Sequence, residues 1–202
     1  MIPSWVWVAF AAMDYGVLHS LLAADCVKSA AESRYPSIFP RYYRLMYNIL
    51  AGLFLVPTGL LVLFLPDKSV YSIPFPYILA TLAGQGLCLL AAGMALKGTG
   101  VDDLLGLSTA AGAAQASGGL KTDGAYRLVR HPVYTLGFIT MLLFPWMTAN
   151  RLALFVTLTL YMVIGAHLEE QRLLRIYGAD YARYRQQVPM FFPRLFPRPD
   201  PD

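Results

Sequence analysis

The sequence predicts an all-α, polytopic membrane protein of about five transmembrane helices, forming a single membrane domain over residues 1–202. Hydrophobic residues make up 57% of the chain and charged residues only 14%, whereas an average soluble domain carries about 25% charged residues. Several apolar stretches approach the roughly 20 residues that a helix needs to cross a bilayer. The basic residues also collect in alternate connections between these stretches, as they do in membrane proteins.

The expected spans cover residues 5–22, 45–65, 77–96, 133–147 and 152–168. No Lys or Arg precedes Lys28. Because a cleaved signal peptide begins with a basic segment, we expect the first span to be retained. The second and third spans contain no charged residue. The last two spans are shorter and are separated by four residues, which predicts a tight helical hairpin.

The distribution of basic residues predicts the orientation of these spans. Fourteen of the sixteen lie in the connection after the first span, at Lys97 and in the loop 98–131 that follows it, or in the tail 169–202, and Lys68 and Arg151 lie on the other side. The positive-inside rule makes the basic side cytoplasmic, with the N-terminus outside and the C-terminus inside, as in a bacterial inner membrane. The stretch 98–120 is rich in Gly, Ala and Ser and is interpreted as either a lid or a linker.

Other classes of site are not expected. Cys26 and Cys88 are the only cysteines and are too far apart in sequence for a CxxC motif, so we expect no metal site and no disulfide framework. The net charge of +4 is explained by membrane topology. Nucleic-acid binding would require a clustered basic face in a soluble domain.

The first polar cluster lies where the fourth span begins. Pro132 suits the first position of a helix and pushes His131 into the capping position. The unpaired N–H groups of that helix, with Arg130 beside them, would form a seat for a carboxylate or phosphate. Alternatively, the arginines anchor lipid head groups, and Tyr126 and Tyr134 belong to an interfacial aromatic belt.

The second cluster lies at the end of the fifth span. Glu169 and Glu170 are disfavoured at a helix C-terminus and close to lipid, so they require cationic partners or a ligand. Arg172, three residues after Glu169, offers a local partner. Three tyrosines at helical spacing follow, namely Tyr177, Tyr181 and Tyr184. They predict a short amphipathic cytoplasmic helix, which interfacial anchoring alone would explain.

A third set of polar residues lies in the first two spans. His19 is an ionisable side chain within a span, which makes it a functional candidate by default. It either lines the same pocket as His131 or forms a hydrogen bond with a neighbour. A watery crevice within the bundle would explain the charged Asp14 in the first span. Arg44, at the mouth of the second span, is a functional candidate whose position lipid anchoring would also explain.

The order and spacing of these motifs resemble those of a known superfamily. The motifs are Arg130-His131-Pro132 with Tyr134 and Gly137, and Glu169-Glu170 followed by Tyr177-Gly178, Tyr181, Tyr184 and Val188-Pro189. They are similar to the C-terminal signature of integral-membrane methyltransferases, over roughly residues 102–193. His19-Ser20, Lys28, Arg44 with Tyr47-Asn48, and residues 103–107 are more similar to the NnrU-like branch, which contains methanethiol S-methyltransferases.

The resemblance implies S-adenosyl-L-methionine as methyl donor and S-adenosyl-L-homocysteine as product. The implied donor-binding residues are Tyr126, Arg130, His131, Pro132, Tyr134, Gly137, Glu169, Glu170 and Tyr181, with the tail 169–202 completing the site. The implied acceptor is a small thiol or another lipophilic molecule that reaches the site from the membrane. His19, Arg44 and His131 are the candidates for binding or deprotonating that acceptor.

Alternatives remain open at this stage. Phosphatidylethanolamine N-methylation and isoprenylcysteine-type carboxyl methylation use the same donor. A non-catalytic assembly or regulatory factor of the NnrU-like kind would bind no donor. A sterol-reductase-like oxidoreductase has a related tail pattern, but its many additional spans do not fit into 202 residues.

Overall fold

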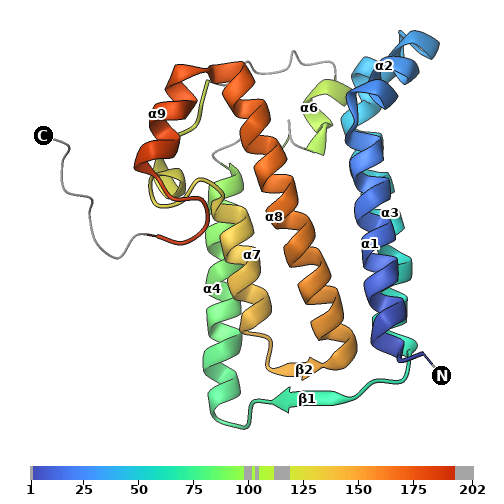
Figure 1. Cartoon of the computed structure of the whole chain (residues 1–202), viewed down its shortest axis with the longest axis vertical. Coiled ribbons are helices and arrows are strands. Elements are labelled where there is room, and N and C mark those ends of the chain that lie inside the picture. Colours follow the sequence, from blue (N-terminus) through green and yellow to red (C-terminus); the bar gives the residue numbers. More distant parts are fainter. Residues whose placement is uncertain (1, 98–101, 103–104, 112–118, 194–202) are drawn as a thin grey trace, which may run out of the picture.

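The computed structural model describes residues 2–97, 102, 105–111 and 119–193 and confirms an all-α membrane architecture (Figure 1). Four of the described helices are long and apolar enough to cross a membrane: α1 (Ser4–Ala23), α3 (Phe39–Phe64), α4 (Tyr77–Lys97) and α8 (Ala149–Tyr177). A fifth apolar helix, α7 (Pro132–Leu142), is shorter. The predicted lid-or-linker segment 98–120 falls largely outside the described residues.

Shorter elements occupy the two ends of the bundle. They are α2 (Asp25–Arg34), α6 (Leu107–Ala110), the 3-10 helix η1 (Gly124–Arg127), α9 (Ala179–Gln187) and the strands β1 (Ser69–Ser72) and β2 (Trp146–Thr148). The last turns of α1, α4 and α8 and the first turns of α3 and α7 lie at one end, which we call the site end (Figure 1). The two strands pair antiparallel at the opposite end.

Helix α1 packs against both α3 and α8, and small residues allow its close approach to α8. Val8, Ala12 and Gly16 recur every four residues and are buried along one face of α1. A Cβ atom on Gly16 would lie 2.9 Å from Cδ2 of Tyr161 in α8. In lipid, where hydrophobic driving force between helices is weak, such close van der Waals packing holds helices together.

The fourth span is shorter than predicted. Helix α7 ends at Leu142 instead of residue 147, and its 11 residues rise only about 16 Å, roughly half of a hydrocarbon core. Pro145 explains the early end, because the residue before a proline is disfavoured in helical geometry. The chain then turns through β2 into α8, so the hairpin link is longer than the four residues expected. Helix α7 packs mainly against α4.

The link is fixed by polar contacts at the end opposite the site. Oδ1 of Asp67 accepts hydrogen bonds from the backbone N–H groups of Lys68 (2.8 Å) and Asn150 (3.0 Å). Burial works against the charge of this carboxyl, but hydrogen bonds, including one from Thr148, lower the pKa of Asp67 below its usual value. The ionised carboxylate therefore caps the start of α8 from outside the helix.

The close approach of α1 and α8 makes Gly16→Ala a test of this packing. The added methyl group requires Tyr161 to move, and overpacking of this kind usually costs about 1 to 3 kcal/mol. We expect a lower unfolding temperature in detergent micelles. Gly86→Ala in α4 is the matched control, because nothing lies within 4 Å of its added methyl group. It should raise the free energy of unfolding by up to about 1 kcal/mol through helix propensity. If both variants changed stability in the same direction, the close packing of Gly16 against Tyr161 would be contradicted.

Candidate active site

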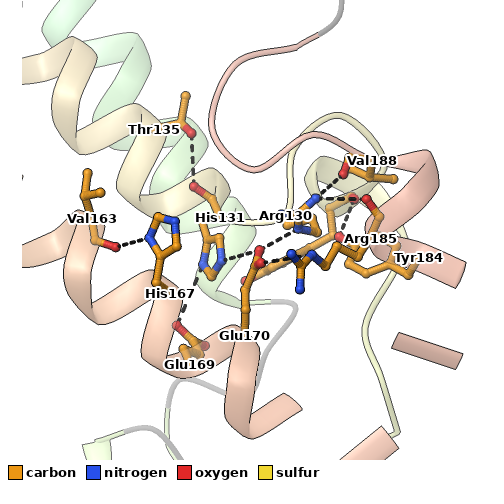
Figure 2. Close-up of polar contacts among 11 residues, drawn as sticks. Arg130, His131, Thr135, Val163, His167, Glu169, Glu170, Tyr184, Arg185 and Val188 are labelled. Atoms are coloured by element: carbon orange, nitrogen blue, oxygen red, sulfur yellow. Dashed lines mark hydrogen bonds and ion pairs between the residues drawn. The ribbon is translucent and has the colours of Figure 1, made fainter. Parts of the chain in front are cut away.

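Arg130 joins three segments at the site end of the bundle (Figure 2). Its Nε atom donates to Oε1 of Glu170 in α8 at 2.6 Å, and its Nη1 atom donates to the carbonyl oxygens of Val188 (2.5 Å) and Arg185 (3.1 Å). The side chains of Arg130 and Glu170 are only 9% and 6% exposed. The guanidinium thereby ties the segment before α7 to α8 and to the end of α9 and the residue after it.

The backbone continues this connection. The N–H of Arg130 donates to the carbonyl oxygen of Pro189 at 2.9 Å, and the N–H of His131 donates to that of Met190 at 3.1 Å. Two successive residues before α7 are thus paired with two successive residues after α9. The described segment after α9 is thus held beside the start of α7.

His131 is the residue at the N-cap of α7, as predicted, and it is buried. Its Nε2 lies 3.4 Å from Glu170, its Nδ1 lies 3.7 Å from Glu169, and its ring stacks on that of Tyr134 at 5.4 Å. Burial lowers the pKa of His131, and nearby Arg130 lowers it further, although both carboxylates oppose the shift. The imidazole is therefore neutral near pH 7.

The two adjacent glutamates have different surroundings, as their separation of about 100° around a helix requires. Glu170 is buried and is paired with Arg130, with Oε2 also 3.7 Å from Nε of Arg185. The side chain of Glu169 is 49% exposed. Among the described side chains, Glu169 lies beside the imidazole of His131, and no ion pair with the local partner Arg172 forms there.

A cavity of about 150 Å³ lies beside this cluster. Its polar lining consists of four tyrosines, two cationic side chains, an imidazole and a carboxylate: Tyr126, Tyr177, Tyr181, Tyr184, Lys121, Arg130, His131 and Glu169. Tyrosine faces and a carboxylate attract a cationic group. Lys121, with Nζ 5.9 Å from the centre of the Tyr126 ring, offers charge to an anionic one.

The tyrosines of α9 face inward. Tyr181 is 1% exposed and forms a small core with Tyr184 and Val188. The Tyr184 hydroxyl donates to the carbonyl oxygen of Tyr126 at 2.7 Å, and burial raises its pKa to about 12, although Arg130 acts in the opposite direction. Interfacial anchoring therefore does not account for Tyr181 and Tyr184, because these buried side chains pack against Leu120 and against residues of α8.

The structure brings most of the predicted donor-site residues together. Tyr126, Arg130, His131, Glu169 and Tyr181 line the cavity. Tyr134 and Glu170 contact His131, and Pro132 is the first residue of α7. Gly137 lies apart, where an added Cβ would meet Met162 of α8 at 3.8 Å. Arg130 differs from expectation, since its Nε and Nη1 already bind protein atoms instead of forming an open anion seat.

The predicted acceptor residues of the first two spans form a separate group. Nε2 of His19 in α1 lies 2.5 Å from the hydroxyl of Tyr47 in α3. Arg44 lies one turn before Tyr47, and an added Cβ on Gly106 would collide with the backbone of residues 44 and 45. His131, the third candidate, belongs to the cavity.

Three polar residues of the cavity, Lys121, Tyr177 and Tyr184, had no assigned role in the sequence-based prediction. Lys121 lies outside both polar clusters, and its only signal was its position at the end of the Gly-rich stretch. Tyr177 and Tyr184 belonged to the tyrosine stripe, but the period of that stripe fits an interfacial anchor as well as a core. The assignments of these tyrosines depend on the packing of α9 against α8.

Comparisons with known proteins agree with this arrangement. The profile of the phospholipid methyltransferase family matches residues 82–180, which is close to half of the chain and includes the first polar cluster and the pair Glu169-Glu170. The resemblance to the integral-membrane methyltransferases is thereby confirmed. The relatives found are themselves named as methyltransferases, and no solved structure matches the chain.

Three relatives illustrate the extent of the similarity. The methanethiol S-methyltransferase of Crocosphaera subtropica is 40% identical over 73 residues, which cover 36% of this chain and 29% of the relative. Methanethiol S-methyltransferase 1 of Bradyrhizobium diazoefficiens is 42% identical over 36% of this chain and 26% of its own. The methanethiol S-methyltransferase of Mycobacterium tuberculosis is 37% identical over 37% of this chain and 31% of its own. The match thus spans less than a third of each relative.

Replacing Arg130 tests its role as a connector. Arg130→Ala leaves Glu170 buried without its closest charge partner, and breaking such a pair usually costs about 3 to 5 kcal/mol. We expect a large drop in unfolding temperature and faster proteolysis after α9. Arg127→Ala, an exposed arginine in the adjacent η1 helix, is the control and should change neither. Equal stability of both variants would show that Arg130 does not hold the tail.

Proposed function

We propose that the protein is an S-adenosylmethionine-dependent integral-membrane methyltransferase acting on a small thiol or another lipophilic acceptor. One observation carries this proposal. The turn around Arg130 and His131 and the pair Glu169-Glu170 are some 40 residues apart, yet both lie within the family match and meet beside one cavity. We further propose that the basic site end faces the cytoplasm of a bacterial inner membrane.

The cavity suits parts of the proposed donor. The donor carries positive sulfonium and ammonium groups, for which Glu169 and the faces of Tyr126 and Tyr181 are suitable partners. Its carboxylate would be matched by Lys121. Pockets for ligands of this size usually measure about 300 to 1000 Å³. The cavity of about 150 Å³ therefore accommodates one portion of the molecule, such as the amino-acid end.

The donor, when bound, supplies an electrophilic methyl group for an in-line displacement. The tasks of the protein are orientation and exclusion of water, since water stabilises the charged ground state. The buried side chains of Tyr181 and Tyr184 exclude water from one wall of the cavity. The ion pair between Glu170 and Arg130 fixes the wall that α8 contributes. No side chain needs to act as a nucleophile.

Binding of S-adenosylhomocysteine and S-adenosylmethionine to the purified protein in detergent, measured by calorimetry, tests the donor. Glu169→Gln keeps the shape of a half-exposed side chain but removes its charge, so folding should be unaffected. Loss of a charged hydrogen bond of about 1.5 to 3 kcal/mol predicts roughly 10- to 100-fold weaker binding of the methionine end.

Glu32→Gln is the matched control, because this glutamate is exposed on α2, outside the cavity. It should bind the donor like the unmodified protein. Absence of binding to a folded, monodisperse sample would overturn the proposal in favour of a non-catalytic assembly factor. Product analysis with an alkanethiol, phosphatidylethanolamine and a prenylcysteine then distinguishes the acceptors.

A further inference from the structure

A second polar cluster lies within the bundle, outside the cavity. His19 of α1 is surrounded by three tyrosine rings: Tyr47 of α3 at 4.8 Å, Tyr15 of α1 at 5.5 Å and Tyr161 of α8 at 6.1 Å between ring centres. All three transmembrane helices that meet here contribute to it. A histidine within such a segment is costly to keep and therefore needs a reason.

The hydrogen bonding of His19 is incomplete. Its Nε2 is 2.5 Å from the Tyr47 hydroxyl, whereas its Nδ1 is buried and has no hydrogen-bond partner among the residues that the structure describes. A neutral imidazole has one donor and one acceptor nitrogen. When Nε2 carries the hydrogen and donates it to the Tyr47 oxygen, the lone pair of Nδ1 is available to accept a proton.

An apolar groove of about 590 Å³ between α1 and α8 borders this cluster at Tyr161. Its outer lining includes Met13, Val17 and Ile164, which are more than half exposed on the lipid-facing sides of their helices. At its polar end the hydroxyls of Ser20 and Tyr161 are 3.1 Å apart. The Tyr161 ring that lines the groove also packs edge-on against His19. A small apolar molecule dissolved in lipid fits this lining.

The cluster is also connected to the cavity. The ring of Tyr134 stacks on His131, which lines the cavity. The Tyr134 hydroxyl is close enough to those of Tyr161 and Tyr47 to interact with both electrostatically. Tyrosines from three helices thus connect the surroundings of His19 with those of His131 through ring contacts and electrostatic interactions.

We propose that His19, oriented by Tyr47, is the base that accepts the proton of a thiol entering through the groove between α1 and α8. This inference rests on the proposed function and adds the residue that activates the acceptor. Most thiols are protonated near pH 7, and the thiolate is the nucleophile. The S–H proton passes to Nδ1 of His19. The thiolate sulfur forms a bond to the donor methyl carbon, and the electron pair of the broken carbon–sulfur bond returns to the donor sulfur.

Thiophenol, whose thiolate absorbs in the ultraviolet, tests the proton transfer without any donor. At a pH below the pKa of thiophenol, binding to the unmodified protein should produce the thiolate band. His19→Gln should abolish it, and Tyr47→Phe, which keeps the ring but removes the hydroxyl, should reduce it several-fold. His167→Gln is the matched control, because this exposed histidine bonds to the carbonyl of its own helix at Val163; it should keep the full band.

Turnover provides a second readout with acceptors of similar size and different acidity. His19→Gln should lose at least tenfold more activity with cyclohexanethiol than with the more acidic thiophenol, because the latter needs less help from a base. Calorimetry with S-adenosylhomocysteine should show unchanged donor binding in this variant. An undiminished thiolate band in His19→Gln overturns the role of His19, whereas absence of donor binding to the unmodified protein overturns the proposed function.

Discussion

The buried ion pair between Arg130 and Glu170 is the constraint on which the site depends. A buried pair of charges is tolerated only when its remaining donors and acceptors are satisfied. Here two backbone carbonyl oxygens accept hydrogen bonds from Nη1 of Arg130, and His131 and Arg185 lie near the carboxylate of Glu170. The pair fixes the beginning of α7, the last turns of α8 and the segment after α9 relative to one another. The walls of the cavity are the consequence.

Features set by composition and local geometry were predictable from the sequence. The charge-free stretches 45–65 and 77–96, which make up most of α3 and α4, follow from hydropathy, and the helix start at Pro132 follows from proline geometry. The end of α7 was missed, although Pro145 signalled it, because an apolar stretch does not distinguish helix from an extended continuation. The pairing of β1 with β2 depends on two segments 73 residues or more apart, so no local pattern reveals it.

The candidate site likewise has features that the sequence predicts and features that it does not. The clusters around His131 and Glu170 were visible as polar residues where lipid makes polarity costly. Which of Glu169 and Glu170 is buried could not be predicted, since neighbouring residues of a helix differ only in what packs against them. The partners of Arg130 are equally hidden, because two are backbone carbonyls with no side-chain signal.

Helix α8 packs against α1 on one side and against α7 and α9 on another, so it is a wall shared by two halves of the chain. The N-terminal helices build the groove and the histidine cluster, and the C-terminal segments build the cavity. Under the proposed function, substitutions in α1 and α3 would change which acceptor is methylated and would leave the proposed donor site intact. A new substrate would then require only a new neighbour for one face of a single helix.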